Sequence, residues 1–586
     1  MSEPNRNTLW GRVMVEELVR AGVNAVCVAP GSRSTPLVVA CAEHPDVRLL
    51  SHLDERSAAY FALGRAKRSG VPTPIVCTSG TATANLHPAV IEADRTRVPL
   101  LLLTADRPAD LRDSGANQTI DQQKLYGDAV RWYRELPEPR VDPSTLRSLR
   151  TTLSLAVETS MQVPKGPVHL NVPLRKPLEP TPVPGDVPDD FADSHPRAAM
   201  GRDGPYVRTW RGRTRPEPAA LSALCDVLEA AERGLLVAGP SDRLSGATVR
   251  ALASATGFPV LADPISGVRF ARENGDAPVV GGYDSFLDEP VTDTWPEPDV
   301  VVRFGAAPTS VTLQRYLRDS TARQFVVDPA AGGLREATFA ASDWLVADES
   351  ELIDVLLDAF EHSPVDPAWC ERFERTETAY WEFVEDERGA APLEGAILNA
   401  VFECAPDPST IFVSNSMPIR DADRFGRPRD AALTVLGNRG ASGIDGITST
   451  ALGAGSVTDD PLVLVTGDLA YYHDMNGLLA IERCDVDATI VLLQNDGGGI
   501  FHMLPIESFD PPFTAQFKTP HGLDFEPSGE LYGFDYERVT DRNGFEDAYR
   551  GSLESDGTQV IEVVVDAERS HRRRERLHDR ICRLLS

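Results

Sequence analysis

Lysine is scarce in this chain of 586 residues, which contains only five lysines, at positions 67, 124, 165, 176 and 518. Nearly all of the 58 basic residues are therefore arginines, and 88 acidic residues outnumber them to give a formal net charge of −30. A surface of this charge repels nucleic acids and anionic membranes, so neither is expected as a main partner. A GC-rich genome would explain the few lysines but not the acid excess. The composition instead indicates a halophilic protein, because a high-salt cytoplasm screens the repulsion between acidic groups.

The eight cysteines show no pairing pattern. They form no CxxC pair and do not have the spacing of a zinc site, and two of them stand in apolar, strand-like runs around residues 27 and 77. This favours buried free thiols in a reducing compartment. The N-terminal residues are polar and unlike a signal peptide, and apolar runs such as 98–105 have the length of a strand. We therefore expect a cytoplasmic protein without a membrane span.

Apolar strands alternate with amphipathic helices along the chain. In the first third, strands are predicted around 24–31, 47–53, 73–80 and 98–106, and helices around 9–22 and 55–70. Continuous apolar strands separated by helices indicate a parallel sheet with helices on both faces. The same rhythm recurs twice later, and the length is too great for one core. The sequence thus predicts an α/β protein with three doubly wound parallel-sheet domains.

The domain boundaries follow from composition. We expect a first domain over 1–180 and a linker over 181–215, which is rich in Pro, Asp, Gly and Arg. A central α/β domain is expected over 216–365 and a third domain over 366–586. The basic segment 571–580 is expected to form a solvated helix that pairs with the acidic surface.

Two predicted strands in the last third end in polar residues. One ends in Asp468, and the next ends in Asn495, which is followed by an aspartate and three glycines. In a parallel sheet both ends meet at the edge where ligands bind. A carboxylate, an amide oxygen and the carbonyl of Gly497 are hard ligands of the kind Mg²⁺ prefers, and Gly497 and Gly498 let backbone N–H groups approach a diphosphate. An ordinary strand followed by a turn, with no ligand, would explain the strand end at Asp468 alone or the strand end at Asn495 alone.

These motifs resemble the Gly-Asp-Gly and Asn-bearing turn of thiamine-diphosphate enzymes, with Leu469 in place of the third glycine. The segments GDLAYYHDMNG and NDGGGIFHMLP look like one branch of that superfamily, the 2-succinyl-5-enolpyruvyl-6-hydroxy-3-cyclohexene-1-carboxylate synthases of menaquinone biosynthesis. The resemblance covers nearly the whole chain and is strongest over 8–125 and 410–510. It implies pyrimidine-binding, central and diphosphate-binding domains, with thiamine diphosphate and Mg²⁺, or alternatively Mn²⁺, as cofactors.

The resemblance also assigns an activating carboxylate. Thiamine diphosphate needs a carboxyl group at N1′ of its aminopyrimidine, and the matching residue is Glu55, at the junction of a predicted strand and helix. Such a position is partly desolvated, which raises the pKa of a carboxyl group and suits it to proton sharing. An ordinary first-turn acid favoured by the helix dipole is the alternative, and Asp54 fits equally by composition. Since the family's glutamate serves another subunit, a homodimer or homotetramer with sites at the subunit interface is implied.

Polar residues at other strand ends match the family's substrate motifs. The substrates, 2-oxoglutarate and isochorismate, bring several carboxylates, and arginine forks suit carboxylates. For any single arginine, a surface ion pair is the ordinary alternative. The substrate-binding candidates are Ser32, Arg33, Arg107, Asn117, Gln118, Ser416, Arg420 and Arg439. Those expected to act in catalysis are Glu55, Arg33, Arg107, Gln118, Arg420 and Arg439.

The cofactor-binding candidates include an apolar group that would keep water from the reacting atoms. Its members could equally belong to the core. The full cofactor-binding set is Glu55, Asp468, Leu469, Asn495, Gly497, Gly498, Ile500, Phe501 and Leu504. The expected metal ligands are Asp468, Asn495 and Gly497.

The resemblance implies a transferase. It would decarboxylate 2-oxoglutarate and add the remaining succinyl semialdehyde unit to isochorismate, releasing CO₂. Another thiamine-diphosphate decarboxylase or carboligase, such as an acetolactate synthase, is the first alternative, and the arginine-rich motifs argue against it. A nucleotide-binding dehydrogenase would need a GxGxxG motif after a strand, which the sequence lacks. An intact Glu55, Asp468 and Asn495 argue against a non-catalytic homologue.

Overall fold

The computed structural model describes residues 3–241, 244–271, 278–330, 333, 335–360, 365–387 and 393–586. In these residues the strands form three six-stranded sheets, and every paired strand is parallel to its neighbour. The predicted α/β architecture of three parallel-sheet domains is therefore confirmed. The chain divides into two compact units, unit 1 (1–211, 438–459 and 473–486) and unit 2 (212–437, 460–472 and 487–586).

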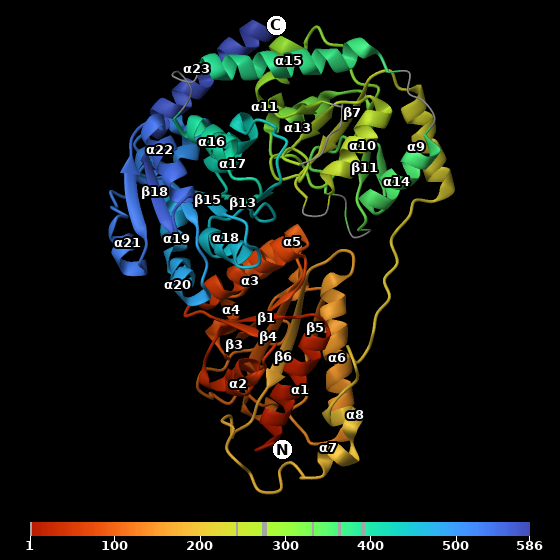
Figure 1. Cartoon of the computed structure of the whole chain (residues 1–586), viewed down its shortest axis with the longest axis vertical. Helices are drawn as coiled ribbons and strands as arrows, with labels where there is room; N and C mark the ends of the chain where they lie inside the picture. Colours follow the sequence, from red (N-terminus) through yellow and green to blue (C-terminus); the bar gives the residue numbers. More distant parts are fainter. Residues whose placement is uncertain are drawn as a thin grey trace. The chain divides into compact units, whose positions relative to one another are not determined.

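Unit 1 contains the first sheet, in the order β2-β1-β3-β4-β6-β5. Its strands are β1 (Ala25–Ala29), β2 (Arg48–Ser51), β3 (Thr73–Cys77), β4 (Leu100–Asp106), β5 (Trp132–Glu135) and β6 (Pro167–Pro173). Its helices are α1 (Arg6–Arg20), α2 (Thr35–Glu43), α3 (Glu55–Ser69), α4 (Thr81–Ala84), α5 (His87–Thr96), α6 (Pro143–Met161), α7 (Phe191–Ser194), α8 (Pro196–Ala199), α18 (Ile447–Gly455) and α20 (Ala480–Cys484). Helices α1, α2 and α6 share one core with the sheet, and α3 contacts β1 and β3 outside that core (Figure 1).

Helix α3 packs on α18, which comes from a much later part of the chain. A Cβ added at Gly64 of α3 would lie 1.9 Å from the carbonyl oxygen of Thr450, and one added at Gly453 of α18 would lie 2.0 Å from that of Phe61. The two backbones therefore touch at these glycines. Close by, the Tyr60 hydroxyl donates a hydrogen bond of 2.5 Å to Asp445.

Unit 2 contains the second sheet, in the order β12-β11-β10-β7-β8-β9, and the third, in the order β14-β13-β15-β16-β18-β17. The strands are β7 (Gly234–Ala238), β8 (Val260–Ala262), β9 (Val279–Val280), β10 (Val300–Phe304), β11 (Arg323–Val327), β12 (Asp343–Leu345), β13 (Ser409–Val413), β14 (Leu433–Leu436), β15 (Leu462–Gly467), β16 (Thr489–Gln494), β17 (Asp535–Val539) and β18 (Gln559–Val564). The helices are α9 (Pro218–Ala230), α10 (Gly246–Thr256), α11 (Tyr283–Phe286), α12 (Glu289–Thr292), α13 (Val311–Asp319), α14 (Glu349–Ala359), α15 (Pro367–Asp386), α16 (Leu393–Cys404), α17 (Met417–Phe425), α19 (Asp468–His473), α21 (Pro527–Tyr532), α22 (Arg542–Leu553) and α23 (Ala567–Leu585).

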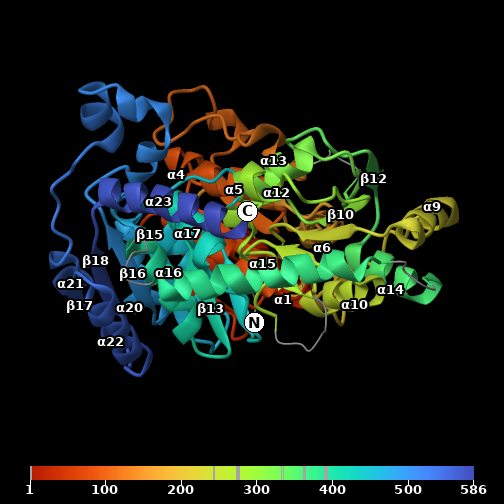
Figure 2. The same cartoon turned by 90° about the horizontal axis from the view of Figure 1, so that it is seen from above.

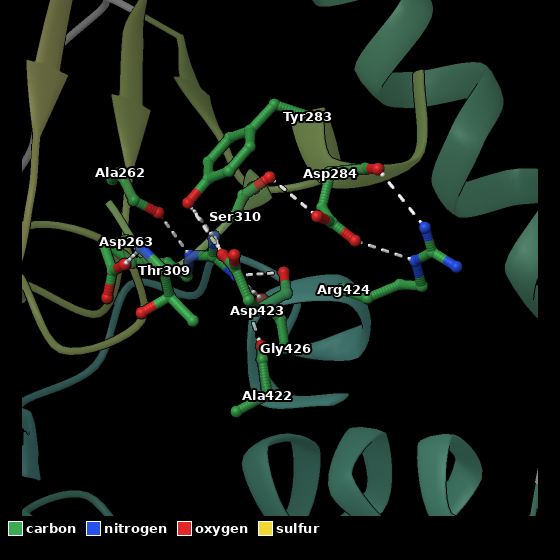
Figure 3. A network of polar contacts seen from close by, with 12 residues as sticks. Ala262, Asp263, Tyr283, Asp284, Thr309, Ser310, Ala422, Asp423, Arg424 and Gly426 are labelled. Carbon is green, nitrogen blue, oxygen red and sulfur yellow. Dashed lines mark hydrogen bonds and ion pairs between the residues drawn. The ribbon is translucent and has the colours of Figure 1, made fainter. Parts of the chain in front are cut away.

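A buried polar network joins α17 to the domain of the second sheet. The guanidinium of Arg269 lies 2.8 Å from Asp423 and also donates to the carbonyl oxygens of Ala262 and Gly426. Figure 3 shows Tyr283 donating to the same carboxylate, at 2.7 Å. Because removal of one partner from a buried ion pair costs about 3–5 kcal/mol, this network favours one arrangement of the two domains.

Two local features differ from the sequence prediction. Part of the expected linker is folded, since Phe191 and Ala198 of α7 and α8 join the core of unit 1. The sequence over 473–484 has a helical pattern, which predicts one helix, but the structure divides it into the end of α19, a 3₁₀ segment at Met475–Leu479 and α20. The break follows Asp474, which is buried and accepts hydrogen bonds from the backbone and side chain of Ser449.

The composition-based expectations on thiols agree with the structure. All eight cysteines are free, and six of them are buried. Among the described residues, no helix is both long and apolar enough to cross a membrane.

Replacement of Gly64 by alanine should destabilise unit 1 by about 1–3 kcal/mol, because the added methyl group overlaps the backbone of α18. Thermal unfolding followed by circular dichroism would measure the change. Gly551→Ala is the matched control, since Gly551 is also in a helix, α22, and no described atom beyond its chain neighbours and its own helix backbone lies within 4 Å of the added Cβ. The control should be neutral or stabilising by up to about 1 kcal/mol. Equal thermal unfolding midpoints for the Gly64 and Gly551 variants would contradict the close contact of α3 with α18.

Candidate functional site

The carboxyl ends of β15 and β16 form the first part of the candidate site. The two strands are adjacent and paired in register, so the residues that follow them lie together. Asp468 is buried, and one of its oxygens accepts the backbone N–H groups of Asn495 at 3.1 Å and Gly497 at 3.0 Å. Its other oxygen accepts the N–H of Leu469 at 2.7 Å. The structure therefore brings together the predicted metal ligands of unit 2.

The polar atoms of Asp468 and Asn495 suit a bound cation. Among the residues that the structure describes, none forms a hydrogen bond with the buried side-chain oxygen of Asn495, and a bound cation would provide the missing partner. Burial raises the pKa of the Asp468 carboxyl, and a neighbouring cation would favour its charged form. In the described parts of the chain, no three His, Cys, Asp or Glu side chains converge on a metal position. A cation here would therefore also need a carbonyl, a diphosphate and water as ligands.

The loop after β16 requires glycine for a backbone reason, and the N–H groups of Gly497 and Gly498 both donate within the protein. Gly497 has a φ of +132°, and an added Cβ would lie 2.0 Å from the carbonyl oxygen of Lys518, so only glycine fits. Gly498 donates its N–H to the same carbonyl at 2.7 Å. One ring nitrogen of His521 lies 3.3 Å from Asp468. No motif in the sequence pointed to His521, which is 53 residues away in the chain.

The apolar candidates follow in a 3₁₀ segment at Gly499–Met503. Ile500 and Phe501 are half-buried, and Phe501 packs edge-to-face on Phe517 with ring centroids 5.5 Å apart. Leu504 is 46% exposed and Leu469 is half-buried. These side chains are thus partly exposed to solvent, as apolar side chains that contact a bound ligand must be.

Two buried arginines lie together in unit 1. Arg33 donates to the carbonyl oxygen of Leu174 at 2.7 Å, and Arg107 donates to the hydroxyl of Ser79 at 2.9 Å and to the carbonyl of Asn117 at 2.5 Å. Burial and the proximity of Arg107 lower the pKa of Arg33. Two desolvated guanidinium groups at one place make a strong site for a carboxylate.

The loop that carries Asn117 and Gln118 is tied to the end of β3. Ser79 donates its hydroxyl to the carbonyl of Gln118 at 3.0 Å, and the Gln118 amide donates back to the carbonyl of Ser79 at 3.2 Å. Gln118 has a φ of +54°, and such strain in a residue other than glycine is typical of functional sites. Ser32 begins the short 3₁₀ turn that contains Arg33. Ser79 was missed as an individual candidate, although its loop is one of the polar loops at a strand end.

The structure separates the roles of Asp54 and Glu55. Asp54 is the N-cap of α3, and its carboxylate accepts the N–H groups of Arg56 at 2.8 Å and Ser57 at 3.3 Å. Glu55 is the first helical residue, is half-buried and makes no hydrogen bond or ion pair within the described residues. The capping role therefore falls to Asp54, and Glu55 is the carboxylate available to a ligand.

The loop that carries Arg439 is held by a buried glutamate. Glu92 of α5 is 2% exposed, and its two oxygens accept the N–H groups of Gly440 at 2.9 Å and Ala441 at 2.6 Å. The two residues that follow Arg439 are thus fixed within unit 1. Sequence reasoning missed Glu92, because its partners lie almost 350 positions away along the chain.

Ser416 and Arg420 lie at the start of α17 in unit 2. Ser416 is the N-cap with a φ of +72°, another strained position, and its carbonyl accepts a hydrogen bond of 2.6 Å from Arg420. The candidates thus divide between the units. Ser32, Arg33, Glu55, Arg107, Asn117, Gln118 and Arg439 belong to unit 1, and Ser416, Arg420, Asp468, Leu469, Asn495, Gly497, Gly498, Ile500, Phe501 and Leu504 belong to unit 2.

Three domain families match the chain in sequence. They are the thiamine pyrophosphate enzyme N-terminal TPP binding domain over residues 10–125, the middle domain of thiamine pyrophosphate enzymes over 210–413 and the C-terminal TPP binding domain over 424–563. Among solved structures, the thiamine diphosphate-dependent 4-hydroxybenzoylformate decarboxylase of Rhodococcus jostii RHA1 matches with a TM-score of 0.71, covering 95% of this chain and 99% of that one. At 19% sequence identity, this likeness shows the fold alone.

Curated relatives match over their full length and share one name, 2-succinyl-5-enolpyruvyl-6-hydroxy-3-cyclohexene-1-carboxylate synthase. The protein of Haloarcula marismortui is 60% identical, and that of Halobacterium salinarum is 58% identical, each over 100% of both chains. The protein of Roseiflexus sp. (strain RS-1) is 47% identical over 98% of both chains.

Replacement of Glu92 by glutamine should destabilise unit 1 by about 1–3 kcal/mol, because one N–H of the Arg439 loop would then face an amide NH₂ group instead of an acceptor. Chemical denaturation would measure the loss. Glu43→Gln in α2 removes the same charge from an exposed position of the same unit and should change stability by less than about 0.5 kcal/mol. A Glu92 variant as stable as this control would refute the role of the carboxylate in holding the loop.

Proposed function

Because the chain belongs to the family of 2-succinyl-5-enolpyruvyl-6-hydroxy-3-cyclohexene-1-carboxylate synthases, among the thiamine-diphosphate enzymes, we propose that it catalyses the reaction in that name. It decarboxylates 2-oxoglutarate and joins the remaining four-carbon unit to isochorismate, releasing CO₂. Two groups of residues carry the proposal. The first is the loop after β16 in unit 2, residues 495–499, which we call the diphosphate-type loop. The second is the pair of buried arginines in unit 1, Arg33 and Arg107. The first group of residues suits the cofactor, and the second suits substrates with several carboxylates.

The cofactor site uses few protein groups. Asp468, the side-chain oxygen of Asn495 and the carbonyl of Gly497 would hold Mg²⁺ or Mn²⁺, which in turn would hold the diphosphate. Thiamine diphosphate, when bound, supplies the electron sink for the loss of CO₂ from a 2-oxo acid. Glu55 would share a proton with N1′ of the aminopyrimidine, and its half-buried carboxyl group, which pairs with no other described side chain, suits this task.

Substrate binding rests on positive charge and fixed donors. Arg33 and Arg107 hold carboxylate groups and offset the net charge of −30 at this place. Arg420 and Arg439 provide further guanidinium groups, each on a backbone held by hydrogen bonds. Ser32, Asn117, Gln118 and Ser416 add polar contacts. Ile500, Phe501 and Leu504 exclude water from the reacting carbon.

We further propose a homodimer or homotetramer in which two subunits complete each site, because the family resemblance implies that Glu55 serves a partner's cofactor. The acid excess and the halophilic relatives support a high-salt cytoplasm as the location.

The proposed reaction is tested by incubating the protein with thiamine diphosphate, Mg²⁺, 2-oxoglutarate and isochorismate at low and multimolar salt. Loss of isochorismate absorbance should accompany a product with the mass of isochorismate plus a succinyl semialdehyde unit. Omission of the cofactor, or chelation of the metal with EDTA, should abolish the product. Cofactor binding without this product at any salt concentration would redirect the search to other 2-oxo acids, with pyruvate as the first donor to try.

Glu55→Gln should retain the fold and lose about 10²–10⁴-fold in kcat, because an amide cannot share a proton with N1′. Steady-state turnover measures the loss, and circular dichroism verifies the fold. Asp54→Asn is the matched control, because asparagine also caps helices and should keep nearly full activity. The opposite result, an inactive Asp54 variant beside an active Glu55 variant, would exchange the two roles.

A further inference from the structure

The C-terminal helix α23 is more than a solvated basic tail. Arg574 is only 7% exposed, although it stands in a segment with six charged neighbours. Leu577 and Ile581 pack in one core with Tyr283 and Tyr380 of the second-sheet domain. Figures 1 and 2 show α23 extending from the third sheet to α15, and both helices belong to unit 2. The helix therefore connects parts of unit 2 that are far apart in sequence.

One side chain of α23 reaches the helix that carries Arg420. Arg574 forms an ion pair with Asp421 of α17, whose side chain is fully buried. On the same short helix, Asp423 pairs with Arg269, and Arg424 pairs with Asp284 at 3.0 Å. Three ion pairs therefore fix the orientation of α17. Arg420 precedes them and donates to the carbonyl at the start of its own helix.

A second contact joins α23 to the segment after the diphosphate-type loop. Arg572 donates to Glu507 at 2.9 Å, and the same oxygen of Glu507 lies 2.8 Å from the imidazole of His502. The first turns of α23 also line a small cavity together with Met417 of α17 and Asn495. The beginning of α23 thus touches both the start of α17 and the loop of the proposed metal site.

We propose that α23, through Arg574, is a positioning element for Arg420, so that the C-terminal helix sets the geometry with which a substrate carboxylate is bound. Loss of the Arg574 charge would leave Asp421 buried and uncompensated, and α17 would shift to reach water or another partner. A guanidinium fork binds a carboxylate only within narrow limits of distance and angle. Arg574 itself touches no substrate in this proposal, which rests on the proposed function only for the identity of that substrate.

Arg574→Met should therefore loosen α17 and weaken substrate use. In the cofactor-free protein, amide hydrogen exchange over residues 414–426 should rise. In the loaded enzyme, kcat/KM should fall by about 10–100-fold, mainly through KM, as expected for a misplaced binding group. Arg574→Lys keeps the charge and should restore most of the protection and activity.

Arg580→Met is the matched control, because Arg580 lies on the same helix, is half exposed and pairs with Glu387 away from α17. It should leave both the exchange over 414–426 and the kinetics unchanged. If Arg574→Met fails to fold, Asp421→Asn removes the same ion pair at nearly constant volume and should give the same two changes.

Exchange and kinetics that stay at wild-type values in the Arg574 or Asp421 variant would overturn the proposal. A uniform rise of exchange over the whole of unit 2 would also overturn it, since it would indicate a general stabilising role. A wild-type protein without turnover would count against the proposed function alone, and the exchange comparison would still decide the positioning role of α23.

Discussion

Three charged side chains of α17 lie buried in unit 2, away from solvent. Asp421 and Asp423 are at most 1% exposed and Arg424 is 9% exposed, so each requires a partner of opposite charge. The partners come from three separate places, namely α23, the segment after β8 and α11. A buried ion pair adds little net stability compared with an apolar contact, but its separation is costly. The network therefore acts mainly by excluding every other arrangement of the two sheets and the C-terminal helix.

The positions of the candidate residues follow from this constraint and from simpler ones. Parallel strands place their carboxyl ends at one edge, which brings Asp468 to the backbone of Asn495 and Gly497. Strained backbone at Ser416 and Gln118 is retained because neighbouring hydrogen bonds hold both residues in place. In each case a hydrogen bond with a neighbouring residue fixes the backbone that carries the candidate side chain.

The sequence predicted those features that are local. Continuous apolar strands, their polar ends and the free thiols all appear in short segments, and the structure agrees with each of them. Short strands such as β9, with two residues, carry too little pattern to be recognised. Groups with distant partners were also missed. Glu92 and the loop it binds are 348 residues apart, and Arg574 and Asp421 are 153 apart. Composition alone left Asp54 and Glu55 equivalent, and only the capping geometry distinguishes them.

The discontinuity of unit 1 has a consequence for how this protein is made. Residues 1–211 leave the ribosome long before α18, which covers the backbone of α3 at Gly64. Until then, a helix whose residues 57–67 are all buried in the finished protein presents one bare face to solvent. Such a surface attracts chaperones or other nascent chains, because exposed apolar area drives association. The first domain can therefore complete its folding only near the end of synthesis, when its own chain returns to cover it.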